Sequence, residues 1–94
     1  MLDRKTIMFY VEAVKKFMRS YEEELQDSSF FISFNPYLEY GYHDPQIGWV
    51  TRTSDERFSK EDANIFLDKV IEETALQESD GMIRQIRGEL MQWS

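Results

Sequence analysis

The chain has 94 residues, of which 41% are hydrophobic and 15% aromatic, enough for one small core and too many for intrinsic disorder. It contains no cysteine, which excludes disulfides, thiol nucleophiles and zinc–thiolate sites. Its 18 acidic and 11 basic side chains give a net charge of −7, which makes duplex nucleic acid a poor partner, because binding phosphates requires clustered Lys and Arg.

We expect the N-terminal stretch to carry no signal for export or membrane insertion. Its apolar run, residues 7–11, ends at Glu12 and is too short for a signal peptide, and no later segment approaches the length of a membrane span. We therefore expect one soluble, cytoplasmic domain over residues 1–94, with no membrane contact.

A first amphipathic helix is predicted over residues 4–26. Asp3 is placed to cap it, and Leu2 and Ile7 stand where a hydrophobic staple would. Apolar residues then recur at alternating spacings of four and three: Ile7, Val11, Val14, Met18, Tyr21 and Leu25. The acidic run 22–24 is unfavourable near a helix C-terminus, so we expect Leu25 to anchor that end in the core.

The apolar arc of this helix is wider than one neighbour would cover. Phe9, Tyr10, Ala13 and Phe17 extend it beyond the main stripe, and such a helix needs two neighbours. We expect it to lie between the sheet and the last helix. The alternative is a homodimer in which this helix meets its copy across a two-fold axis.

Between residues 29 and 53 the hydrophobic period changes to two, which predicts a three-stranded antiparallel meander. The residues that share a face within each strand are Phe30, Ile32 and Phe34, then Leu38, Tyr40 and Tyr42, then Ile47 and Trp49. Turns are expected at Asn35-Pro36 and at residues 43–46. Tyr37, Tyr40 and Tyr42 cannot all face inward in an alternating strand, so some tyrosine surface is expected to be exposed.

Two helices are predicted to follow, which makes the order α-β-β-β-α-α and the class α+β. Ser59 marks the start of the first, which is expected to end near Leu76, with a core arc of Ala63, Phe66, Leu67, Val70, Ile71 and Thr74. Ser79 or Asp80 caps a short final helix with an inner face of Met82, Ile83, Ile86, Leu90 and Trp93.

The middle helix has an acidic side opposite its core arc, formed by Glu61, Ile65, Asp68, Glu72 and Leu76. Residues 54–80 hold nine acidic and three basic side chains. Asp68 and Glu72 are four apart and repel by roughly a few tenths of a kcal/mol, which a helix optimised for stability alone would avoid. The two interpretations are a solvated face with scattered apolar residues and an acidic docking surface with two apolar anchors.

No catalytic, cofactor-binding or metal-binding motif is present. The only histidine, His43, neighbours Asp44 in a predicted turn, and adjacent residues there point in different directions, so we expect a solvated histidine. The glycines form no phosphate-binding loop, and no serine stands in a nucleophile motif. We therefore expect no enzyme, cofactor or metal. A hydrolase that uses two carboxylates remains the enzymatic alternative.

The leading hypothesis is a non-enzymatic protein-binding module, such as an inhibitor, immunity factor or adaptor, for a partner with a basic surface. The expected contact residues are Glu61, Ile65, Asp68, Glu72, Leu76, Tyr37, Tyr40 and Tyr42. One alternative is a DNA-mimic inhibitor of a nucleic-acid-binding protein. Another is a small acidic secretion chaperone, a dimer that holds an unfolded segment on the first helix or the sheet.

Overall fold

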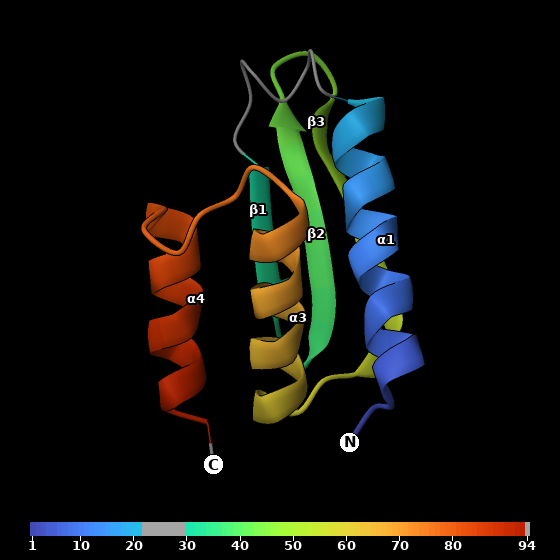
Figure 1. Cartoon of the computed structure of the whole chain (residues 1–94). Coiled ribbons are helices and arrows are strands. Elements are labelled where there is room, and N and C mark those ends of the chain that lie inside the picture. Colours follow the sequence, from blue (N-terminus) through green and yellow to red (C-terminus); the bar gives the residue numbers. More distant parts are fainter. Residues whose placement is uncertain (22–29, 94) are drawn as a thin grey trace.

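The computed structural model describes residues 1–21 and 30–93 and has the predicted α+β order (Figure 1). The elements are α1 Arg4–Ser20, β1 Phe30–Phe34, β2 Tyr37–Asp44, β3 Gly48–Arg57, α3 Lys60–Glu73 and α4 Gly81–Met91. The strands form one antiparallel sheet in the order β1-β2-β3. The described helices lie on one face of it, with α3 between α1 and α4 (Figure 1).

Helix α1 begins as its capping signal predicts. The Thr6 N–H donates to Asp3 Oδ1 at 2.8 Å, and Leu2 packs against the core that Ile7 enters. The described helix ends at Ser20. Its expected extension to residue 26, with the acidic run 22–24 and Leu25, lies outside the described residues.

The prediction that α1 packs against the last helix is wrong. Helix α1 packs against α3, with Lys15 Nζ 2.8 Å from Glu73 Oε1, and the Phe17 ring meets the Tyr40 ring of the sheet at 5.3 Å. Helix α4 packs instead against α3 and β1. The chain passes from β3 to α3 through Phe58 and Ser59, and this short connection brings α3 in beside α1.

The turn between β2 and β3 determines which side chains of β3 face the helices. Asp44 Oδ1 accepts hydrogen bonds from the N–H groups of Gln46 at 2.8 Å and Ile47 at 3.1 Å, and Gly48 supplies a φ of +88°. The resulting register places Val50 opposite the buried Tyr42 and Trp49 opposite the exposed His43.

Strand β3 therefore differs from β1 and β2 in its pattern. Trp49 in β3 is 60% exposed, whereas Ile32 in β1 and Leu38 in β2 are buried. Ile47, expected in the strand with Trp49, lies in the turn before it and is 74% exposed. The strand also continues to Arg57, past the expected end at residue 53. Its polar second half does not resemble a strand in sequence, because Asp and Glu are depleted in strands generally.

The two C-terminal helices match the prediction closely. Ser59 and Asp62 form a capping box at the start of α3, in which each backbone N–H donates to the other side chain at 3.1 Å. The helix ends at Glu73, slightly before the expected end. Of the predicted inner face of α4, Ile83, Ile86 and Leu90 are buried, whereas Met82 and Trp93 are half-buried. Asp80 occupies the N-cap position but makes no side-chain capping hydrogen bond.

Candidate functional site

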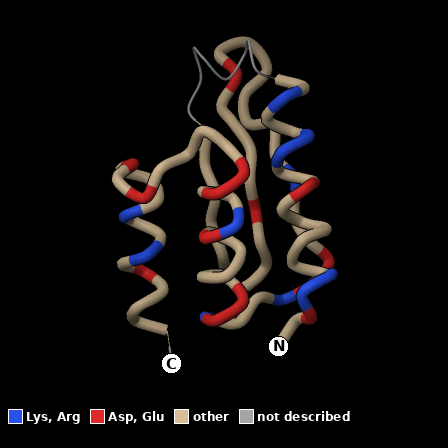
Figure 2. Tube along the Cα trace, in the orientation of Figure 1, with Lys and Arg blue, Asp and Glu red and all other residues tan. Residues whose placement is uncertain are grey.

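Acidic residues recur along α3 (Figure 2), and Glu61, Asp68 and Glu72 are exposed, but the two apolar residues on this side are not. Asp68 Oδ1 accepts a hydrogen bond from Arg87 of α4 at 2.6 Å. Ile65 and Leu76 are half-buried and pack against the core. The expectation that these two side chains are exposed is wrong, because α4 packs against α3 and Arg87 of α4 reaches over this side.

Arg87 joins α3, α4 and their connection through every N–H of its guanidinium. It donates to both carboxylate oxygens of Glu78 at 2.9 Å, to Asp68, and to the side chain and backbone oxygens of Asn64 at 2.7 and 3.3 Å. Hydrogen bonding from Arg87 lowers the pKa of Glu78, and bonding to Glu78 raises the pKa of Arg87. The acidic side of α3 is therefore partly neutralised within the molecule.

We expect the substitution Arg87→Lys to lower the free energy of unfolding by about 1 kcal/mol, since an ammonium cannot reproduce the planar fork that contacts three residues. Urea denaturation at pH 7 measures it. Arg84→Lys is the control, because Arg84 is exposed and has no ion pair among the described residues. Equal effects of the two substitutions would contradict a special role for Arg87.

The expected tyrosine contacts are mostly in the core. Tyr40 and Tyr42 are 7% and 3% exposed and pack around the Phe17 ring. Burial raises the pKa of Tyr40, and the nearby Arg52 partly offsets this. Tyr37 is 36% exposed and lies 5.8 Å from the Arg57 guanidinium carbon. Of the predicted tyrosines, Tyr37 therefore offers surface to a partner.

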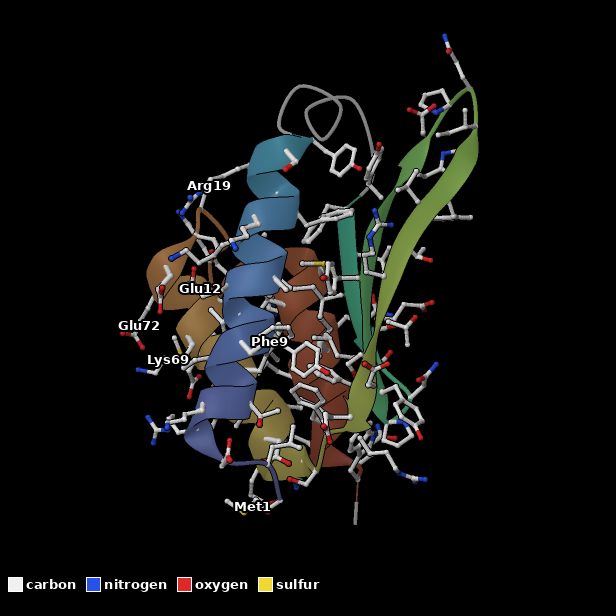
Figure 3. All side chains as sticks on the ribbon, turned by 90° about the vertical axis from the view of Figure 1, so that its right-hand side faces the viewer. Met1, Phe9, Glu12, Arg19, Lys69 and Glu72 are labelled. Atoms are coloured by element: carbon white, nitrogen blue, oxygen red, sulfur yellow. The ribbon has the colours of Figure 1, made fainter. Side chains whose placement is uncertain are left out.

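The other face of the sheet carries a cluster of aromatic side chains that sequence reasoning did not single out. We call the surface formed by Phe31, Glu39, His43, Trp49 and Thr51 the open sheet face, since the described helices lie on the opposite face (Figure 3). The Trp49 ring meets the Phe31 ring at 5.3 Å and the His43 ring at 4.9 Å, both edge-on. One aromatic cluster therefore spans all three strands.

A hollow of about 410 Å³ lies within the open sheet face and is lined by Phe31, Glu39, Trp49 and Thr51. The register places Gly41 of the middle strand between Phe31 and Thr51, where it contributes no side chain. Glu39 is half-buried, and its carboxylate has no hydrogen bond or ion pair with any described residue. The hollow thus combines two aromatic rings with an unpaired carboxylate.

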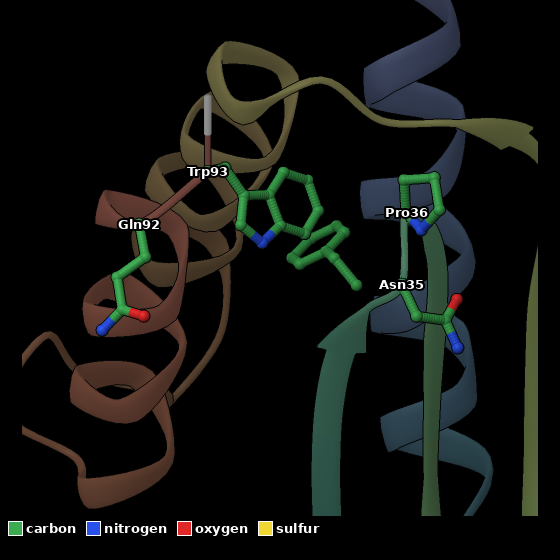
Figure 4. Close-up of a pocket in the computed structure, with 5 residues that line it drawn as sticks. Asn35, Pro36, Gln92 and Trp93 are labelled. Atoms are coloured by element: carbon green, nitrogen blue, oxygen red, sulfur yellow. The ribbon is translucent and has the colours of Figure 1, made fainter.

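Two further hollows have different linings. One, of about 480 Å³, lies between the β1–β2 turn and the end of α4 and is lined by Phe34, Asn35, Pro36, Gln92 and Trp93 (Figure 4). Its lining includes no charged side chain. The other, of about 600 Å³, is bordered by Glu78, Ser79, Arg84, Arg87, Gly88 and Met91. Two of these residues, Glu78 and Arg87, already form an ion pair with each other.

The described residues bring together no set of metal ligands, and His43 and Asp44 make separate contacts. No group of three His, Cys, Asp or Glu residues in the described part of the chain is placed to hold a metal ion. His43 packs against Trp49, whereas the Asp44 carboxylate accepts the backbone N–H groups of its own turn. The structure places His43 within β2 and not in the turn expected at residues 43–46.

The signal that places Trp49 on the open sheet face is present in the turn. Asp44 and Gly48 bracket the residues between the strands, and a turn of this length decides the phase of the following strand. Hydrophobicity alone groups Trp49 with core residues, because a large apolar side chain is usually buried.

Within residues 1–21 and 30–93, no helix combines the length and the apolar character needed to cross a membrane. No protein-family model matches the chain, and no curated protein or solved structure matches it either.

Proposed function

We propose that this chain is a non-enzymatic protein-binding module, such as an inhibitor or adaptor, and that it contacts its partner through the open sheet face. The observation that supports this proposal is the 60% exposure of Trp49 within an aromatic cluster. The solvent face of an antiparallel sheet is normally polar. Tryptophan is among the residues most enriched in the energetic centres of protein interfaces.

The charge of the molecule supports a basic partner. The net charge is −7, and acidic residues are numerous along α3 and its connection to α4 (Figure 2). Such a field raises the rate of association with a basic surface without needing direct contact. In this proposal α3 attracts the partner and the open sheet face binds it.

The absence of cysteine is consistent with a cytoplasmic location, which we include in the proposal.

Site-specific photocrosslinking in the source cells tests the proposal. The crosslinker p-benzoylphenylalanine is placed at Thr51, which is exposed on the open sheet face, and separately at Glu72, which is exposed on α3. We expect a defined covalent adduct with another protein at Thr51 and none, or a much weaker one, at Glu72. Adducts formed at Glu72 alone would contradict the proposal and favour the acidic helix face.

A small acidic secretion chaperone is the second candidate, favoured by the same uncovered aromatic surface and by Phe9, which is 65% exposed on α1. A chaperone of this kind is expected to be a stable dimer, as the sequence-based hypothesis states. Sedimentation equilibrium separates the two candidates, since the binding module is expected to be a monomer of 11.3 kDa.

The DNA-mimic hypothesis is less favoured, because Arg87 neutralises Asp68 on the acidic side of α3.

A further inference from the structure

We infer that the hollow on the open sheet face receives a lysine or arginine side chain of the partner protein. This inference rests on the proposed function and specifies the chemistry that the surface recognises. It follows from three features of the hollow. The lining contains an unpaired carboxylate and two aromatic rings, and it contains no basic side chain.

The carboxylate of Glu39 is the polar centre of the hollow. It lies on the middle strand, and its neighbours across the sheet are Ser33 and Thr53, neither of which carries a charge. Withdrawing a carboxylate from water without a cation is unfavourable, and a bound cation restores the lost interaction. A half-buried, unpaired Glu39 is therefore expected to favour a cationic group over a neutral one.

The rings of Phe31 and Trp49 suit the same occupant. They meet edge to face with their centroids 5.3 Å apart. A cation is attracted to the face of an aromatic ring, most strongly to tryptophan, and the attraction increases when both are desolvated. The hollow, of about 410 Å³, has room for a long aliphatic side chain with a charged end.

The nearby arginines of the chain are engaged elsewhere. Arg52 lies on the helix side of β3, 5.6 Å from the centroid of the Phe17 ring, and donates to the Thr51 carbonyl oxygen at 3.0 Å. Arg57 lies over the Tyr37 ring. No ion pair within the described chain therefore satisfies Glu39, and the cation has to come from outside.

A partner of different sequence is a better source of this cation than a second copy. Each copy carries a net charge of −7, so two copies repel over distance. The basic residues of the chain are concentrated on α1 (Figure 2), where Lys15 already bridges Glu12 and Glu73. A basic peptide has the complementary charge.

Selection from a random dodecapeptide library displayed on phage tests the inference, with the full chain as bait. We expect the enriched peptides to share a lysine or arginine. Replacing that residue in a synthetic enriched peptide with norleucine or citrulline is expected to weaken binding by about 10-fold or more. Enriched peptides without a basic residue would overturn the inference.

Matched variants of the chain locate the cation. Glu39→Gln is expected to weaken binding of the enriched peptide by about 10-fold or more, whereas Glu72→Gln removes the same charge from α3 with little effect. Trp49→Ala is expected to weaken binding by a similar factor, and Phe9→Ala, which removes an exposed ring on α1, is the control. Equal losses in Glu39→Gln and Glu72→Gln would overturn the assignment, since they indicate unspecific attraction.

Nuclear magnetic resonance locates the bound peptide, because the chain has two tryptophans and each gives its own indole N–H signal. The indole N–H signal of Trp49 is expected to shift when the peptide is added, and that of Trp93 is not. Photocrosslinks at Thr51 combined with unchanged peptide binding by Glu39→Gln would overturn the cation site and leave the proposed function standing. Peptide shifts confined to α3, with no crosslink at Thr51, would overturn both.

Discussion

Replacing Gly41 with alanine is expected to lower the free energy of unfolding by about 3 kcal/mol, as overpacking at a rigid contact does. An added Cβ would lie 2.9 Å from the Thr51 Cα and 3.0 Å from the Val50 carbonyl carbon, and closer still to the Val50 carbonyl oxygen. All three atoms belong to the backbone of β3, which cannot move away without breaking its pairing with β2. Urea denaturation followed by circular dichroism measures the change.

Gly88→Ala is the matched control and is expected to have the opposite sign. Gly88 is exposed within α4, and nothing lies within 4 Å of an added Cβ. Alanine there is expected to stabilise the chain by about 0.5–1 kcal/mol, because glycine is a poor helix former. A Gly41→Ala protein as stable as the original would show that the two strands are not as close at this point.

Replacing Asp62 with alanine is expected to cost about 3 kcal/mol of stability at pH 7, because it leaves two N–H groups without an acceptor. The carboxylate is 0% exposed. It accepts the Leu2 N–H at 3.1 and 3.2 Å and the Ser59 N–H at 3.1 Å, which ties the segment before α1 to the start of α3. Glu61→Ala is the control, since this neighbouring carboxylate is exposed.

The pH dependence distinguishes the charge of Asp62 from its shape. Burial raises the pKa of Asp62, but hydrogen bonds from Ser59 and Leu2 outweigh it, so the pKa in the folded state lies below the ordinary 3.8. Its contribution is therefore fully present above pH 3.8 and is lost as the pH falls through the lower, folded-state value.

The conservative variant Asp62→Asn makes this measurable. We expect it to be less stable than the original chain by a constant amount from pH 7 down to about 5, and the difference to shrink below pH 3.8. A difference independent of pH throughout the acidic range would indicate that the ionised form is not the one that holds the two N–H groups.

The helices could be predicted because their signals are local. Asp3 and Ser59 each accept an N–H three residues ahead, a short-range interaction that the order of residues reveals. The apolar spacing identified Ile7, Val11 and Val14 in α1 and Phe66 and Val70 in α3 as buried. The element order followed from these helices and the change of period between them.

The candidate site depended on information that the pattern of hydrophobicity does not contain. Trp49 belongs to the open sheet face because the Asp44 turn sets the register. Glu39 was proposed as the cation site because its carboxylate has no ion pair with a described residue, which the sequence does not show. The sequence gives no sign that Asp68 is paired, because its partner Arg87 lies on α4, nineteen residues away in sequence. These are contacts between elements, and a single sequence does not show how helices are arranged on a sheet.

The placement of the two tryptophans allows binding to the open sheet face to be followed by intrinsic fluorescence. Trp49 is solvated on the open sheet face, while Trp93 is half-buried beside the β1–β2 turn (Figure 4). The chain substituted Trp93→Phe therefore has a single indole emitter, positioned where the partner is expected to bind. The emission wavelength of Trp49 and its accessibility to a collisional quencher are expected to change when a partner covers that surface, so no attached dye is needed.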